Sequence, residues 1–155
     1  MTSTLGKIAE PRETRAMGSE GELLFVYGTL RPGVEHELQE LLRQHARLVG
    51  NATFRGRLYD LGEYPGAVES SDDQDVVTGN VYRILNGAVV WPTLDAYEEY
   101  FPADRDSEFV RKQMPIQFRD SERAVAWIYA YNRDTANLKR ILSGDYLQAL
   151  GMAAD

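Results

Sequence analysis

The order of the predicted elements constrains the fold of this chain more than any other feature. A short apolar strand at residues 23–27 precedes an amphipathic helical segment at residues 34–49, and strand-like segments then dominate: residues 52–61, 76–85, 108–118 and 124–131. A short helix at residues 91–100 interrupts them, and the tail at residues 137–150 is helical or mixed, with a break at Ser143-Gly144. Because strands and helices do not alternate regularly, a doubly wound parallel sheet is excluded.

Glycines inside two of the strand candidates indicate the shape of the sheet. The segments ATFRGRLYDL and VVTGNVYRIL each carry an embedded glycine, which is typical of a bulge or of a bend at a barrel corner. We therefore predict an α+β fold: one small domain built on a bent, barrel-like mixed β-sheet with a few flanking helices. Residues 1–21 are small, polar and charged, and we expect a disordered leader there and a single domain over residues 22–155.

The charge balance argues against two classes of partner. The chain carries 24 acidic and 17 basic side chains, a formal net charge of -7, whereas nucleic acids and anionic membranes attract concentrated basic patches. Charged residues interrupt any apolar signal-peptide core near Met1, and no stretch approaches the length of a membrane span. The chain has no cysteine, which excludes disulfides and thiolate catalysis. We expect a cytoplasmic protein that binds neither nucleic acid nor membrane.

The stretch LFVYGTLRPG at residues 24–33 has the glycine spacing of a phosphate-binding loop, because Gly28 and Gly33 are five positions apart. That loop requires Lys and then Ser or Thr directly after the second glycine. Here Val34 and Glu35 follow, and the carboxylate of Glu35 would repel phosphate. The sequence therefore predicts a strand-to-helix turn and no nucleotide cofactor.

Metal and serine-nucleophile chemistry are also poorly supported. His36 and His45 are nine positions apart on one predicted helix, so they do not share a face, and SSDDQD at residues 70–75 lacks the glycine and distal glutamate of a calcium loop. No G-x-S-x-G elbow is present. We predict no metal and no cofactor, and proton transfer in an enzyme of this composition falls to carboxylates and tyrosines.

One carboxylate stands out in the helix at residues 91–100. Glu98 lies three to four positions from apolar anchors on the same helical face, whereas Glu99 is turned by about 100°. A carboxylate among Tyr97, Tyr100 and Phe101 on the inward side of a helix would have a raised pKa and suit general base catalysis. From spacing alone, the alternative of a solvated surface glutamate stays open.

In combination, a series of short motifs resembles the γ-glutamyl cyclotransferase-like family, which includes γ-glutamylamine cyclotransferases. The matches, in chain order, are YGTLR at residues 27–31, GRLY at 56–59, YP at 64–65, GNVY at 79–82, LDAYE at 94–98, FVR at 109–111, and an aromatic strand with Trp127 and Tyr129. The resemblance implies a small α+β domain around a barrel-like mixed sheet. The chain departs from the family pattern at Glu99, where glycine is usual, and at Phe109, where many members have tyrosine.

The resemblance also implies a reaction and a set of site residues. The family enzyme cyclises a γ-glutamyl group to 5-oxoproline and releases an amine or amino acid, with no cofactor. The resemblance implies that Glu98 is the catalytic acid/base. It also implies that the turn Gly28, Thr29 and Leu30 supplies backbone donors to the substrate, and that Gly28 allows the substrate to approach the main chain closely. Tyr27 and Tyr129 would line the pocket. Arg31 would pair with a substrate carboxylate or face solvent.

Two alternative functions on the same scaffold are compatible with the sequence. One is a related γ-glutamyl acyl transferase or an enzyme that removes a γ-glutamyl protecting group, and the other is a non-catalytic small-molecule binding or sensor protein. The position of Glu98 discriminates between an enzyme and a binding module, because a catalytic Glu98 must lie in a cavity facing the Gly28 turn rather than in bulk water. We expect a small-molecule γ-glutamyl substrate and a monomer or homodimer.

Overall fold

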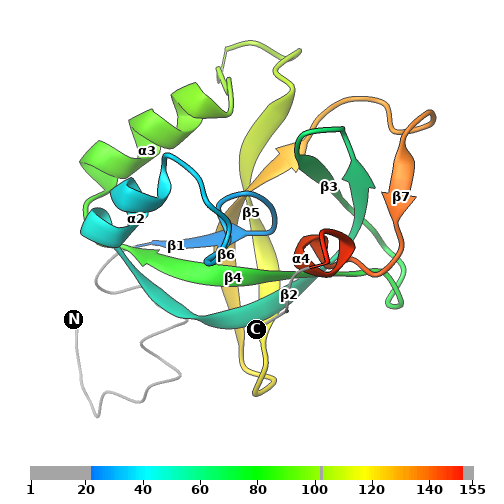
Figure 1. Cartoon of the computed structure of the whole chain (residues 1–155), viewed down its shortest axis with the longest axis horizontal. Helices are drawn as coiled ribbons and strands as arrows, with labels where there is room; N and C mark the ends of the chain where they lie inside the picture. The colour runs from blue at the N-terminus through cyan, green and yellow to red at the C-terminus, as the bar shows by residue number, and fades with distance from the viewer. Residues whose placement is uncertain (1–21, 102, 152–155) are drawn as a thin grey trace.

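The computed structural model describes residues 22–101 and 103–151 (Figure 1). The leader predicted at residues 1–21 lies outside the described residues. The described chain forms one sheet system with three helices against it, and the predicted α+β fold on a barrel-like mixed sheet is confirmed.

Five strands close into a barrel. In spatial order they are β2 (Ala46–Asp60), β4 (Val76–Ile84), β1 (Leu23–Val26), β6 (Arg123–Tyr131) and β5 (Phe109–Phe118). The pairing of Ala52 and Thr53 in β2 with Phe118 and Gln117 in β5 closes the ring. Strands β1 and β6 run parallel and the other barrel pairs are antiparallel. Closure leaves no open edge between these strands, which is how small β-proteins avoid edge-to-edge association.

The long strand β2 belongs to two sheets. Its first part pairs with β4 as far as Arg55, and its last part, from Gly56 onward, pairs with β3 (Pro65–Glu69) and β7 (Lys139–Ile141). At Gly56 a Cβ atom would lie 2.5 Å from the Phe54 ring and from the Val68 carbonyl oxygen. The embedded glycine therefore permits the close packing at the point where β2 changes partners, in agreement with the predicted bend.

The first helix is shorter than predicted. Helix α2 covers only Gln39–His45, whereas the sequence predicted residues 34–49. Residues from Ala46 onward pair with β4, so the ladder hydrogen bonds of β2 replace the helical ones there. Turns occupy most of the stretch between Gly33 and Gln39, and Gly33 itself has a positive φ of 94°. Tertiary strand pairing has overridden a helical apolar spacing.

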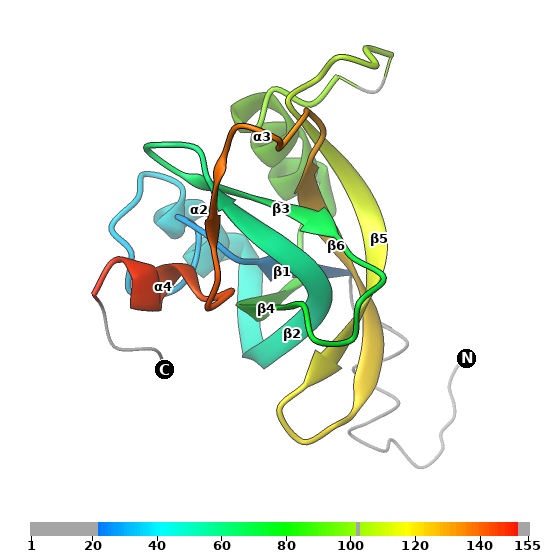
Figure 2. The ribbon, with the colours of Figure 1, turned by 90° about the vertical axis from the view of Figure 1, so that its right-hand side faces the viewer.

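The other helices also differ in their limits. Helix α3 (Gly87–Tyr97) begins four residues before the predicted start, so Pro92 lies in its interior and not in its first turn. The tail contains both β7 and a short helix, α4 (Tyr146–Ala149), and the predicted break falls at Gly144, whose φ is 71°. Figures 1 and 2 show α2 and α3 side by side against the barrel, and α4 near β7.

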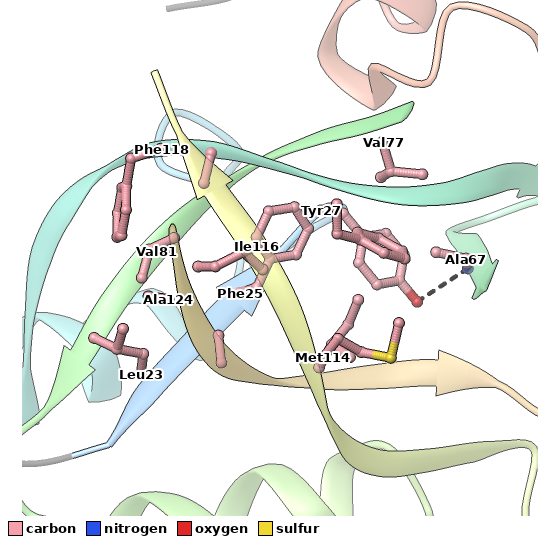
Figure 3. Close-up of a cluster of buried hydrophobic side chains, with 14 of the residues drawn as sticks. Leu23, Phe25, Tyr27, Ala67, Val77, Val81, Met114, Ile116, Phe118 and Ala124 are labelled. Atoms are coloured by element: carbon pink, nitrogen blue, oxygen red, sulfur yellow. Dashed lines mark hydrogen bonds between the residues drawn. The ribbon is translucent and has the colours of Figure 1, made fainter. Parts of the chain in front are cut away.

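Two hydrophobic clusters meet at β1. Alternate side chains of a strand point to opposite faces, so Phe25 and Tyr27 enter the barrel interior while Leu24 and Val26 face the helices. Figure 3 shows the interior cluster, in which Phe25 packs among side chains from several strands. The second cluster joins β1 to Leu42 of α2 and to Val90 and Leu94 of α3. All four residues of β1 are buried, which explains the continuous apolar run in its sequence.

Candidate active site

A cavity of about 220 Å³ lies where five segments meet, at the ends of β1 and α3, the starts of β3 and β5, and β6. Its lining includes the predicted catalytic residue and the five predicted substrate-binding residues: Glu98, Tyr27, Gly28, Thr29, Leu30 and Tyr129. The remaining lining residues are Phe25, Val26, Tyr64, Pro65, Tyr97, Glu99, Glu108 and Phe109. Residues more than a hundred positions apart in the chain thus share one space.

The turn after β1, from Gly28 to Leu30, is part of the cavity lining. The Arg31 N–H donates to the Gly28 carbonyl at 3.0 Å and closes the turn. In the described part of the chain, the N–H groups of Gly28, Thr29 and Leu30 have no backbone acceptor. Successive N–H groups in a turn form a concavity that binds anionic oxygen atoms.

Gly28 makes a close contact within the protein. A Cβ atom at this position would lie 2.7 Å from Cγ and 2.9 Å from Cδ of Pro65, so any larger residue would push the first residue of β3 away. The structure thus supplies a packing reason for glycine here. The Y-P motif and the Y-G motif are two sides of one contact.

Arg31 has neither of the roles considered from sequence. It is 1% exposed and is absent from the cavity lining. Its Nε donates to Asn80 Oδ1 at 2.7 Å, and its Nη1 pairs with Asp145 Oδ1 at 2.9 Å. Asp145 is also the N-cap of α4, where it accepts hydrogen bonds from the N–H groups of Leu147 and Gln148. Arg31 therefore anchors the turn to β4 and to the C-terminal helix, a contact that no local pattern reveals.

The hydroxyls of the two predicted pocket tyrosines have partners inside the protein. The Tyr27 hydroxyl donates to the Tyr129 carbonyl at 2.6 Å and accepts from the Ala67 N–H at 3.2 Å, the contact drawn in Figure 3. The Tyr129 hydroxyl donates to Asp95 Oδ1 at 2.6 Å. Burial raises the pKa of both phenols, so both stay protonated. Tyr27 and Tyr129 thus shape the wall of the cavity with their rings.

Glu98 lies at the end of α3, where it is the C-cap residue and its N–H donates to the Leu94 carbonyl at 2.9 Å. Its side chain is half-buried and lines the same cavity as the Gly28 turn. Burial, with a smaller contribution from the negative charge of Glu108, raises the pKa of Glu98 from 4.5 to about 7. A carboxyl group with this pKa can accept and return a proton near neutral pH.

A charged network connects the last turns of α3 to the barrel. Asp95 accepts two hydrogen bonds from Arg111, Nε at 2.9 Å and Nη2 at 3.2 Å, in addition to the bond from Tyr129. The Arg111 guanidinium lies 4.6 Å from the ring centroid of Trp91 and 4.8 Å from that of Trp127. Because Asp95 is three residues before Glu98, this network holds the helix end that carries the candidate catalytic group.

A second carboxylate in the cavity was missed by the sequence analysis. Glu108, half-buried, accepts hydrogen bonds from the Tyr64 hydroxyl at 3.0 and 3.2 Å. Burial is the largest cause, and this hydrogen bond the next, of the rise in the pKa of Tyr64 to about 12. Tyr64 belongs to the quoted Y-P motif, and Glu108 directly precedes the Phe109–Arg111 motif. Their proximity to known motifs was the only available signal.

Glu99 departs from the family pattern at a position where the backbone favours glycine. It follows the C-cap Glu98 and has a φ of 56°, in the left-handed region that ends many helices. A side chain in this region costs about 1–2 kcal/mol, which is why glycine is preferred there. In this chain Glu99 thus has a strained backbone conformation and adds a carboxylate to the cavity lining.

Replacement of Glu99 by glycine should stabilise the protein by about 1 kcal/mol, because it removes the strain of a side chain at positive φ and offsets the entropy cost of glycine. The measurement is urea denaturation at pH 7. Glu99→Ala is the control, since it removes the same carboxylate but keeps the Cβ atom, and it should give no comparable gain. Equal stabilities for the two variants would show that the backbone conformation is not strained.

Two kinds of feature are absent from the described residues. No group of three or more His, Asp or Glu side chains among them is placed to hold a metal ion. None of the helices in the described ranges is both long and apolar enough to cross a bilayer.

Comparisons with known proteins agree with the motif series. The sequence model described as gamma-glutamyl cyclotransferase, AIG2-like, matches residues 24–148. The gamma-glutamylcyclotransferase family protein YtfP of Escherichia coli K12 is 35% identical over 127 residues, which cover 80% of this chain and 95% of that protein. The gamma-L-glutamyl-butirosin B gamma-glutamyl cyclotransferase of Niallia circulans is 32% identical over 113 residues, 72% of this chain and 67% of that protein.

A solved structure shows the same fold. The mouse AIG2-like protein superimposes with a TM-score of 0.66 at 20% identity, over 86% of this chain and 95% of that one. The family model and the named relatives confirm the interpretation of the sequence as a cyclotransferase-like enzyme. The chain belongs to the γ-glutamyl cyclotransferase, AIG2-like family.

Proposed function

We propose that this protein cyclises a γ-glutamyl amine or γ-glutamyl amino acid to 5-oxoproline and releases the free amine, with Glu98 as the general acid/base. One observation carries the proposal: a half-buried carboxyl group with a pKa of about 7 lines the same cavity as a turn whose N–H groups have no backbone acceptor within the described chain. Such a pairing suits a reaction in which a proton moves while negative charge develops on an oxygen atom.

The turn after β1 would bind the anionic atoms of the substrate. The N–H groups of Gly28, Thr29 and Leu30 are suited to the substrate carboxylate or to the oxygen of the tetrahedral intermediate. The rings of Tyr27 and Tyr129, whose hydroxyls already have protein partners, would pack on the methylene groups. The γ-glutamyl group would then be held folded, with its amine near its own carbonyl, and this positioning supplies much of the rate enhancement.

Glu98 would move the proton between the two nitrogen atoms. Its carboxylate takes a proton from the substrate ammonium group, and the amine then attacks the γ-carbonyl carbon to form the ring carbon–nitrogen bond. The protonated Glu98 gives its proton to the departing nitrogen as the original amide bond breaks. The second proton lost by the ring nitrogen leaves with the product amine, which departs as an ammonium ion. The two nitrogens thus exchange two protons, and the reaction needs no external oxidant or nucleophile.

The test is product identification. Incubation of the protein with γ-glutamyl amides and γ-glutamyl dipeptides should release 5-oxoproline and the free amine in equal amounts, measured by liquid chromatography with mass detection. Release of glutamate in place of 5-oxoproline would indicate hydrolysis, and transfer of the γ-glutamyl group to an added amine would indicate an acyl transferase. Tight binding of these compounds without any product would favour the sensor protein.

The pH profile provides an independent check. Since Glu98 must be ionised to accept the proton and its pKa is about 7, log kcat/KM should fall by about one per pH unit below pH 7. A profile that remains flat between pH 5 and pH 8 would contradict the role of Glu98. Glu108→Gln should move this acidic limb to lower pH, because the charge of Glu108 contributes to the raised pKa of Glu98.

The relative from Niallia circulans is named for removal of a γ-glutamyl group from butirosin B. A similar deprotecting role for this protein is the same reaction with a larger leaving amine. The exposed rings of Tyr64 and Tyr97 beside the cavity support it, because a large leaving group would extend over them to solvent.

A further inference from the structure

We propose that this cavity selects γ-glutamyl amides whose leaving amine carries a second positive charge, and that Glu99 and Glu108 recognise that charge. The inference rests on the proposed function and specifies its substrate class. It excludes the γ-glutamyl derivatives of ordinary amino acids, whose leaving group carries a carboxylate, as preferred substrates.

The first argument is the charge of the cavity lining. Of the residues that line it, Glu98, Glu99 and Glu108 are acidic, and the set contains no lysine, arginine or histidine. The guanidinium groups of Arg31 and Arg111 form ion pairs outside the lining, Arg31 with Asp145 and Arg111 with Asp95. A γ-glutamyl group itself is a zwitterion, so it brings one ammonium and one carboxylate. If Glu98 faces the ammonium and the turn binds the carboxylate, no residue of the described lining supplies an opposite charge to Glu99 or Glu108.

The second argument is the place of these two carboxylates at the cavity. Both oxygen atoms of Glu108 lie within 3.2 Å of the Tyr64 hydroxyl. Glu99 is exposed and lines the cavity from a backbone position with left-handed conformation, directly after the helix end. Glu108 directly precedes β5 and Glu99 follows the end of α3, so they line the cavity from two different segments.

The third argument is the aromatic surface beside them. Tyr64 and Tyr97 line the cavity and are 37% and 43% exposed. An ammonium group is attracted to the face of an aromatic ring, and carboxylates next to such rings strengthen the attraction. A methyl group or a carboxylate at the same place would gain neither interaction, and the carboxylate would be repelled by two like charges.

The charge of Glu108 also connects substrate recognition to catalysis. Its repulsion is the second cause of the raised pKa of Glu98, after burial. A cation bound beside Glu108 would cancel that repulsion and increase the ionised fraction of Glu98. A cationic leaving group would therefore improve turnover as well as binding.

The test compares three γ-glutamyl amides of equal length, made from diaminobutane, n-pentylamine and γ-aminobutyric acid. The terminal groups are an ammonium, a methyl and a carboxylate, so the series changes charge with little change in size. We expect kcat/KM to be highest for the diamine, about tenfold lower for the alkylamine, and lower again for the amino acid. Added salt should reduce the difference, because rim charges are screened.

Substitutions test whether Glu99 and Glu108 cause the preference for the diamine amide. Glu108→Gln and Glu99→Gln should each lower the ratio of kcat/KM for the diamine amide over the alkylamine amide. Glu40→Gln, at an exposed carboxylate on α2 that does not line the cavity, should leave the ratio unchanged. The salt dependence of the unaltered protein is the second measurement, so that a variant that fails to fold does not decide the result.

Equal kcat/KM values for the three amides, or a preference for the amide with the carboxylate, would overturn the inference. Release of 5-oxoproline from these amides would still support the proposed reaction. A diamine preference that neither salt nor the two variants reduce would overturn the role of Glu99 and Glu108. If none of the amides gives 5-oxoproline, the proposed reaction is wrong, and the inference is overturned with it.

Discussion

Glu98→Gln should lower kcat for 5-oxoproline release by about a thousandfold and, at the same time, stabilise the protein above pH 7. The loss of activity follows because an amide can neither take nor return the proton, and general acid/base groups contribute factors of about 10²–10⁴. The gain in stability follows because the cavity disfavours the charged form of Glu98, whose pKa is raised from 4.5 to about 7. A residue placed for function and not for stability shows both changes together.

The direction in which stability changes with pH follows from the raised pKa of Glu98. The folded state binds the Glu98 proton more tightly than the unfolded state, so the contribution to stability is fully present below pH 4.5 and is lost as pH rises through 7. Above pH 7 the ionised carboxylate costs on the order of 2 kcal/mol, after allowance for its partial exposure. Glutamine carries no charge and avoids this cost.

The measurement is the free energy of unfolding in urea at pH 4 and at pH 8, beside an assay at pH 7. We expect Glu98→Gln to match the unaltered protein at pH 4 and to exceed it at pH 8. Glu40→Gln is the control, since its exposed carboxylate on α2 does not line the cavity, and it should retain activity and show no such pH dependence. Full activity in Glu98→Gln would remove this residue from the mechanism.

Asp95→Ala should destabilise the protein by about 3 kcal/mol and reduce kcat in the fraction that remains folded. The substitution breaks a partly buried ion pair, with Asp95 20% and Arg111 19% exposed, and leaves the guanidinium between two indole rings without its carboxylate. It also removes the acceptor of the Tyr129 hydroxyl. The last turn of α3 then loses its charged connection to β5 and β6, and Glu98 its fixed position.

Two matched variants separate these contributions. Tyr129→Phe removes only the hydroxyl donor to Asp95, and we expect a loss of about 1–2 kcal/mol. Glu69→Ala breaks the exposed pair between Glu69 of β3 and Lys112, which lies on the same strand as Arg111, β5, and this change should cost under about 1 kcal/mol. Urea denaturation measures all three. If Asp95 positions Glu98, the acidic limb of the pH–rate profile of Asp95→Ala should shift from that of the unaltered protein. An unchanged limb would restrict Asp95 to a structural role.

The strands were predictable where a local pattern and the tertiary pairing agree. The limits of β5 and β6 fall within about a residue of the predicted segments, because β-branched and aromatic runs there are bounded by polar turns. The prediction was wrong where the two disagree. Residues 46–49 carry a helical spacing but pair with β4, since the hydrogen bonds of a long central strand outweigh the weak propensity of one helical turn.

The candidate site was also predictable only in part from the sequence. The motif order singled out Glu98 and the Gly28–Leu30 turn, and both line the cavity. It did not reveal the pairing of Arg31 with Asp145, which are 114 residues apart. Nor did it reveal the hydrogen bonds from Tyr64 to Glu108, because no local spacing records a contact between two loops.

By itself, the sequence determined the types of most elements, the glycines at tight contacts and the residues that mark the family, because these depend on backbone preferences and short-range order. Only the tertiary structure decided which groups share the cavity and how they ionise. The raised pKa of Glu98 requires burial at the end of α3 and a second carboxylate, Glu108, from the loop before β5, and desolvation and charge repulsion depend on distance in space. The chemistry proposed for Glu98 therefore arises from the folding of the barrel around it.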